Sequence, residues 1–155
     1  MNGVCRVFVF SWLVLAALPR LSAGQTAASW LGTWKLNVAR SSSHEPPPYK
    51  RATRRIVASA GGGLTIVDDL VRSRGGILHL EWTGKFDGLD YPVQGVEVML
   101  TNAYRRVDDR TCELIQKIDG AVVATARLAI SPDGKVLTTV MTGNTARTTT
   151  IYEKQ

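Results

Sequence analysis

The chain has 155 residues, a length that suits one ordinary domain with a sizeable core. Lysine and arginine together number 19 and aspartate and glutamate 13, so the formal net charge is +6 at pH 7. This positive balance is enough for solubility but too mild to indicate a nucleic-acid partner, and we expect none.

The first 24 residues are organised like a secretory signal peptide. A positive charge near the start is followed by an apolar run from Val7 to Leu18 and then by small residues. This run is shorter than the roughly 20 apolar residues that a transmembrane helix needs, and no later run is longer. We therefore expect cleavage after Gly24, with Ala27 or Ala28 as alternatives. An uncleaved N-terminal anchor is the other interpretation.

Residues 25–155 would then form a single exported domain, periplasmic or extracellular, with no integral membrane segment. The loss of Arg6 and Arg20 with the signal lowers the net charge from +6 to +4. Only Cys112 would remain, so no internal disulfide can form. Stability must then come from burial and strand hydrogen bonds, and we expect a monomer.

The first expected element is one short helix near residues 27–31. Residues 39–50 follow as the one extended loop, in which Pro46, Pro47 and Pro48 favour polyproline geometry. The rest of the chain consists of segments rich in Val, Ile, Leu, Thr and Tyr, with lengths natural for strands.

Turn residues separate these segments. Asp-Gly between apolar runs is a strong hairpin signal, because a type I′ turn needs positive φ at both central residues. The predicted turns lie at residues 61–63, 74–76, 87–90, 108–110, 119–120, 132–134 and 143–144. Consecutive hairpins of this kind predict an all-β antiparallel meander.

Two segments show the alternation expected of strands with one buried face. In residues 77–86, Leu78, Leu80, Trp82 and Phe86 share a face opposite His79, Glu81, Thr83 and Lys85. In residues 121–130, Val122, Ala124, Ala126, Leu128 and Ile130 lie opposite Thr125 and Arg127. A meander of eight to ten such strands removes its edges by closing into an up-and-down barrel, which is filled by side chains or holds a small ligand.

Three segments carry a resemblance to a known family. Residues 30–36, Trp-Leu-Gly-Thr-Trp-Lys-Leu, resemble the Gly-x-Trp opening strand of the lipocalin and fatty-acid-binding-protein superfamily, the calycins. Residues 149–154 look like the last strand of the fatty-acid-binding branch. Residues 86–93, Phe-Asp-Gly-Leu-Asp-Tyr-Pro-Val, are similar to a segment of small exported bacterial proteins with a lipocalin-like domain.

The resemblance implies a lipocalin-like barrel of 8–10 strands that binds or carries a small hydrophobic molecule. It also implies a structural role for Trp34, packed across the closed end beneath an arginine from a late strand, Arg127 or Arg147. In the fatty-acid-binding branch an arginine two residues before the last tyrosine helps to hold the ligand carboxylate. Thr150 stands there in this chain while Tyr152 is kept, so we do not expect a carboxylate site of that design.

Aromatic and methionine side chains offer apolar area for such a ligand, and tyrosine adds a polar handle. The residues expected to border it are Trp82, Tyr91, Met99, Tyr104, Met141 and Tyr152. Plain core packing is the alternative role for the same side chains.

A second hypothesis is a filled barrel that works through its surface. Arg51, Arg54 and Arg55 lie in the densest basic stretch and are candidates for contact with an anionic partner. The ordinary interpretation of such a stretch is a charged strand edge that prevents aggregation.

A third hypothesis is a small enzyme that uses His79 and Glu81, two residues apart on one strand. A zinc site needs three or four ligands, so this pair is better explained as part of a polar outer face. Cys112 alternates with Leu114 and Ile118 and is expected to be a buried, unreactive thiol. We therefore expect no catalytic residue, no metal and no cofactor.

Overall fold

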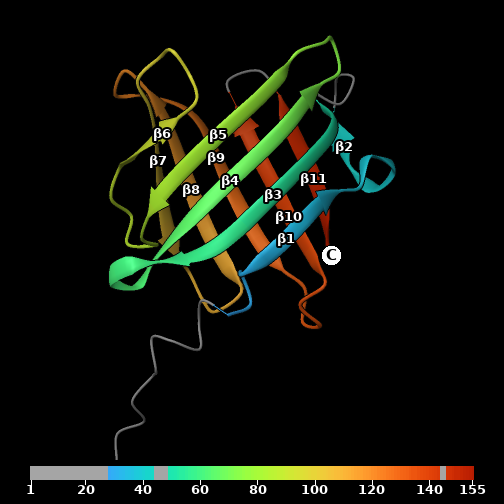
Figure 1. The fold of residues 1–155 in the computed structure, drawn as a ribbon, viewed down its shortest axis with the longest axis horizontal. Helices are drawn as coiled ribbons and strands as arrows, with labels where there is room; N and C mark the ends of the chain where they lie inside the picture. Colours follow the sequence, from blue (N-terminus) through green and yellow to red (C-terminus); the bar gives the residue numbers. More distant parts are fainter. Residues whose placement is uncertain (1–27, 44–48, 144–145) are drawn as a thin grey trace, which may run out of the picture.

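The computed structural model describes residues 28–43, 49–143 and 146–155, so the expected signal peptide lies outside the described residues. These residues form an all-β structure (Figure 1). Its strands are β1 Gly32–Leu36, β2 Ser42–Ser43, β3 Tyr49–Ser59, β4 Gly63–Arg72, β5 Ile77–Gly84, β6 Tyr91–Gln94, β7 Leu100–Arg106, β8 Thr111–Ile118, β9 Ala121–Ile130, β10 Val136–Gly143 and β11 Arg147–Lys154.

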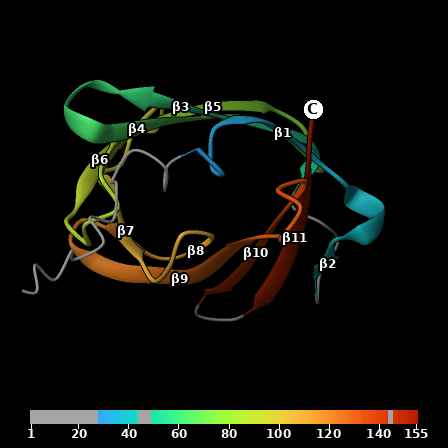
Figure 2. The ribbon, with the colours of Figure 1, turned by 90° about the horizontal axis from the view of Figure 1, so that it is seen from below.

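The strands close into a barrel (Figure 2). From β3 to β11 each strand pairs antiparallel with the next one along the chain, and β1 pairs with both β3 and β11. Trp34 on β1 thus lies opposite Arg54 on one side and Lys154 on the other. The two residues of β2 add only a short ladder to β11. The predicted antiparallel up-and-down barrel is confirmed.

The turn between β8 and β9 shows how local chemistry sets the register of a hairpin. Asp119 and Gly120 both have positive φ, 50° and 81°, as a type I′ turn requires. Asp119 is the one residue other than glycine with positive φ in the described ranges. The Asp-Gly signal in the sequence therefore predicted this hairpin for the correct physical reason.

The segments before β3 differ from the expectation. Residues 28–30 form a turn where a short helix was predicted, and the carbonyl of Trp30 accepts a hydrogen bond of 3.0 Å from Trp34 Nε1. The predicted loop 39–50 contains β2 and part of a 3-10 turn, η1 (Val38–Arg40). Ser41 Oγ accepts a hydrogen bond of 3.0 Å from Ile151 N, which ties this segment to β11.

The predicted buried faces are found in both segments, with one exception near a strand end. Leu78, Leu80 and Trp82 face the core, but β5 ends at Gly84, so Phe86 reaches the core from the following connection. On β9 the predicted face is buried except for Val122, which is 54% exposed. Val122 lies beside a register shift in the β8–β9 pairing, between Gln116 and Lys117.

Aromatic side chains fill one end of the barrel. The Trp30 ring meets the Phe86 ring edge-on at 5.3 Å, and its Nε1 donates a hydrogen bond to the Asp109 carbonyl in the β7–β8 turn. Phe86 in turn stacks on Tyr104 at 5.3 Å. Both tryptophans of the opening motif, Trp30 and Trp34, are buried, so this end has a solid core. Among the described residues, no helix has the length and apolar character needed to cross a membrane.

Candidate functional site

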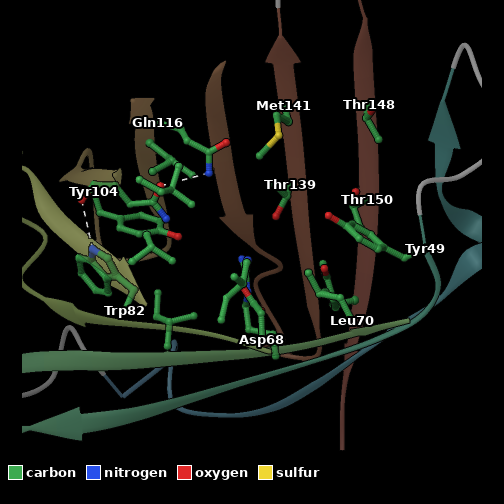
Figure 3. A pocket seen from close by; sticks show the side chains of 18 residues that line it. Tyr49, Asp68, Leu70, Trp82, Tyr104, Gln116, Thr139, Met141, Thr148 and Thr150 are labelled. Carbon is green, nitrogen blue, oxygen red and sulfur yellow. Dashed lines mark hydrogen bonds and ion pairs between the residues drawn. The ribbon is translucent and has the colours of Figure 1, made fainter. Parts of the chain in front are cut away.

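Above this solid end lies a cavity of about 340 Å³ inside the barrel (Figure 3). Its volume is at the lower end of the range of small-molecule pockets, about 300–1,000 Å³. The lining side chains are Tyr49, Arg54, Ile66, Asp68, Leu70, Leu80, Trp82, Val93, Leu100, Asn102, Tyr104, Leu114, Gln116, Thr139, Met141, Thr148, Thr150 and Tyr152. Apolar and aromatic walls with a few polar groups are typical of a ligand site.

The most unusual feature of the cavity is an ion pair in its wall. Arg54 on β3 and Asp68 on β4 are direct register partners, and Arg54 donates from Nε and Nη2 to the two carboxylate oxygens at 2.7 and 2.8 Å. The two side chains are only 13% and 14% exposed. Burial opposes the charge of the guanidinium, but the Asp68 carboxylate outweighs it and holds the pKa of Arg54 well above its usual value. Arg54 and Asp68 are therefore both charged, and together they carry no net charge.

The position of Arg54 corrects the sequence interpretation, which placed it on a basic outer edge. Strand alternation puts Arg54 on the inner face with Ala52 and Ile56, while Arg51 and Arg55 are exposed. Asp68 lies between buried residues on β4 in the same way. The density of basic residues hid this pattern, although the period of two was readable in the sequence.

Hydroxyl groups line the wall formed by the last two strands. Thr139 and Met141 on β10, and Thr148, Thr150 and Tyr152 on β11, all border the cavity. Thr139 is only 7% exposed, and its Oγ1 has no hydrogen-bond partner among the described residues. An unpaired buried hydroxyl costs about 1–3 kcal/mol, so this atom is a candidate to contact a bound molecule.

A pair of amide side chains, the buried Asn102 and the half-buried Gln116, lies in the wall formed by β7 and β8. Asn102 and Gln116 are register partners, and Gln116 Nε2 donates to Asn102 Oδ1 at 3.2 Å. Trp82 Nε1 donates to the backbone carbonyl of Asn102 at 3.1 Å. These hydrogen bonds orient the Trp82 ring toward the cavity. The sequence alone does not show that Asn102 and Gln116 are neighbours, because this depends on the register of β7 and β8.

The structure brings together four of the six residues expected to border a ligand. Trp82, Tyr104, Met141 and Tyr152 line the cavity. Tyr91 and Met99 do not.

The two outlying residues have other surroundings. The Tyr91 ring packs edge-on against Trp82 at 5.8 Å, and its hydroxyl donates to Asp87 Oδ2 at 2.8 Å. Met99 is 71% exposed because it lies in the connection before β7, where strand alternation no longer directs side chains inward.

Trp34 is buried, as expected of a structural residue, but the cation over its ring is a lysine and not the expected arginine. Lys154 Nζ on β11 lies 4.9 Å from the centroid of the Trp34 ring. Arg127 instead faces outward on β9, 3.6 Å from Glu113, and Arg147 is exposed. Lys154 takes this place because β1 and β11 pair to close the barrel, with Trp34 and Lys154 in register.

His79 and Glu81 lie on the outer face of β5, away from the cavity lining. His79 Nδ1 is 2.7 Å from Asp69 Oδ1, in an exposed pair. No group of three potential metal ligands occurs in the described part of the chain. Cys112 is buried, and desolvation raises the pKa of its thiol to about 12, so the reactive thiolate is not formed at neutral pH.

Comparisons with known proteins agree with this architecture. No family model and no curated protein matches the sequence. The structure is similar to that of the wild-type fluorescent protein UnaG, with a TM-score of 0.57, 16% identity, and coverage of 83% of this chain and 99% of that one. It is also similar to the fatty acid transporter REP1-NXSQ, with a TM-score of 0.58, 13% identity, and coverage of 83% and 98%. At these identities the likeness shows the fold alone, a closed antiparallel β-barrel.

Proposed function

We propose that this chain binds or carries a small hydrophobic molecule inside its barrel and performs no chemistry on it. The observation that carries the proposal is the interior cavity of about 340 Å³ with apolar and aromatic walls. A water molecule occupies about 30 Å³ in the liquid, so this volume corresponds to about eleven atoms other than hydrogen. That a fatty acid transporter has the same fold supports the proposal by analogy.

Binding would be driven by removal of apolar ligand surface from water, worth about 25 cal/mol per Å². Leu70, Leu80, Leu100 and Leu114 provide much of the aliphatic wall. The few polar side chains would fix the orientation of the ligand, since each must keep a hydrogen-bond partner when water leaves.

The two alternative functions find less support in the geometry. The hypothesis of a filled barrel that works through a basic surface predicts a solid interior, whereas the barrel contains a cavity. Arg54, one of the three arginines proposed for that surface, is buried in an ion pair with Asp68. An enzyme that uses His79 and Glu81 would need them in the cavity, but both lie outside it.

Filling the cavity tests the proposed function. Met141→Trp adds an indole to the cavity wall and is expected to lower the affinity for 2-naphthol, a neutral fluorescent molecule that matches the cavity in size, at least tenfold, because the remaining volume no longer accommodates it. Met99→Trp makes the same chemical change on the exposed connection and is expected to leave the affinity unchanged. Fluorescence titration of both variants, with native mass spectrometry of the purified wild type, measures this. Equal binding by both variants, or an absence of any bound or bindable apolar ligand in the wild type, would contradict the proposal.

We also propose that the chain is exported and cleaved after Gly24, as the organisation of residues 1–24 suggests. Expression of the full chain in a secreting host, followed by N-terminal sequencing, is expected to give a protein that begins at Gln25. A product that keeps residues 1–24 would contradict cleavage.

A further inference from the structure

The cation in the cavity is already neutralised. Arg54 gives two hydrogen bonds to Asp68, and no described residue accepts one from its Nη1. The carboxylate of Asp68 accepts one hydrogen bond on each oxygen and has lone pairs left over. The pair therefore still offers a donor and an acceptor, side by side, with no net charge.

A second observation points to a hydrogen-bonding ligand group in the same cavity. Thr139 Oγ1 is buried and unpartnered within the described ranges. Figure 3 shows Thr139 and Asp68 both pointing into the cavity, from strands on opposite sides of it. A hydroxyl both donates and accepts, so Thr139 adds to the pair another group of mixed hydrogen-bonding character.

Resting on the proposed function, we infer that the cavity selects a ligand whose polar end is neutral and both donates and accepts hydrogen bonds, an alcohol or a primary amide. Such a group can accept from Arg54 and donate to Asp68 at once. Thr139, on the other side of the cavity, offers the ligand a further donor and acceptor.

Charged polar ends fit this site poorly. A carboxylate only accepts hydrogen bonds and would lie beside the Asp68 carboxylate in a site largely removed from solvent. An ammonium only donates and would meet the Arg54 guanidinium in the same way. The ligand class thus follows from the neutrality of the ion pair and not from the presence of an arginine.

The test compares four ligands that share one tail: decanol, decanamide, decanoate and decylamine. Their size matches the cavity, at about eleven or twelve atoms other than hydrogen. Binding to the purified protein is measured at pH 7.5 by displacement of 2-naphthol, a neutral fluorescent probe, with each ligand kept below its aggregation limit. Decanol and decanamide are expected to bind at least tenfold more tightly than decanoate or decylamine.

Asp68→Asn is the decisive variant. It removes the carboxylate with little change of shape and frees the charge of Arg54, so decanoate is expected to gain at least tenfold and to bind at least as tightly as decanol. Asp69→Asn is the matched control, because it makes the same chemical change one residue away on the outer face and is expected to leave all four affinities unchanged. If circular dichroism shows that Asp68→Asn does not fold, the double variant Arg54→Gln/Asp68→Asn is measured instead. This double variant carries neither charge and is expected to keep the preference for decanol and decanamide.

The outcomes separate the two proposals. If decanoate or decylamine binds the wild type as tightly as decanol, the inference about the polar end is wrong while ligand binding stands. The inference is also wrong if Asp68→Asn folds and decanoate gains no more than with Asp69→Asn, or if the double variant loses the preference for neutral ligands. If none of the four ligands displaces the probe and the wild type holds no apolar ligand, the proposed function itself fails.

Discussion

Replacement of Arg54 by leucine is expected to destabilise the barrel by about 3–5 kcal/mol, because it leaves the buried carboxylate of Asp68 without its partner. The loss exceeds that of a surface ion pair because Asp68, only 14% exposed, remains largely removed from bulk water when Arg54 is gone. Urea unfolding at pH 7.5, followed by tryptophan fluorescence, measures the change in the free energy of unfolding.

Two further variants show whether the pairing is responsible. Arg54→Leu combined with Asp68→Leu removes both charges and is expected to recover most of the stability, since apolar replacement of a buried ion pair is often neutral or stabilising. Arg55→Leu changes the neighbouring, exposed arginine and is expected to alter stability by less than about 0.5 kcal/mol. A loss for Arg54→Leu no greater than that for Arg55→Leu would show that the ion pair is not buried as described.

A rise in pH from 8 to 11 is expected to remove about 5 kcal/mol of stability, through three buried groups that must stay neutral. Burial raises the pKa of Cys112 and of Tyr152 to about 12 and raises that of Tyr104 well above its usual value. Below pH 9 these groups are protonated in both states, so their contribution is fully present. Above pH 9 for the thiol and pH 10 for the phenols, the unfolded chain releases protons that the folded chain retains, so stability falls by about 1.4 kcal/mol per group and pH unit.

Urea unfolding between pH 8 and pH 11 tests this dependence. Cys112→Ala is expected to remove the larger part of the fall between pH 9 and pH 10, where the two tyrosines are still mostly protonated in the unfolded chain. The fall above pH 10 is expected to remain. An unchanged slope between pH 9 and pH 10 in Cys112→Ala would mean that the thiol is not the group responsible.

The strands and most turns of this protein could be predicted from the sequence because their causes are local. Asp119 and Gly120 take the positive φ that the hairpin requires, and the inward direction of Leu78, Leu80 and Trp82 follows from strand alternation alone. Errors appear where the local rule stops. Met99 lies beyond a strand end and Val122 lies beside a register shift.

The candidate site was predicted in part for the same reason. Trp82, Tyr104, Met141 and Tyr152 lie within strands and line the cavity. Tyr91 also lies within a strand, β6, but packs against Trp82 outside the cavity lining, so residue type and strand position limited the candidates without deciding among them. Thr139 carried no comparable signal, because a threonine in a strand is ordinary until its hydroxyl is found buried without a partner.

Sequence alone determined that this chain is a series of hairpins with one apolar face and that its Gly-x-Trp motif resembles the opening of a calycin barrel. Tertiary structure decided which residues meet. Lys154, not Arg127, lies over Trp34, because closure places residues 120 positions apart in register. Register also paired Arg54 with Asp68 inside the barrel, and a neutral pair cannot be distinguished from a free cation until both partners are located. Long-range pairing depends on the closed sheet as a whole, whereas turn and strand preferences depend only on neighbouring residues.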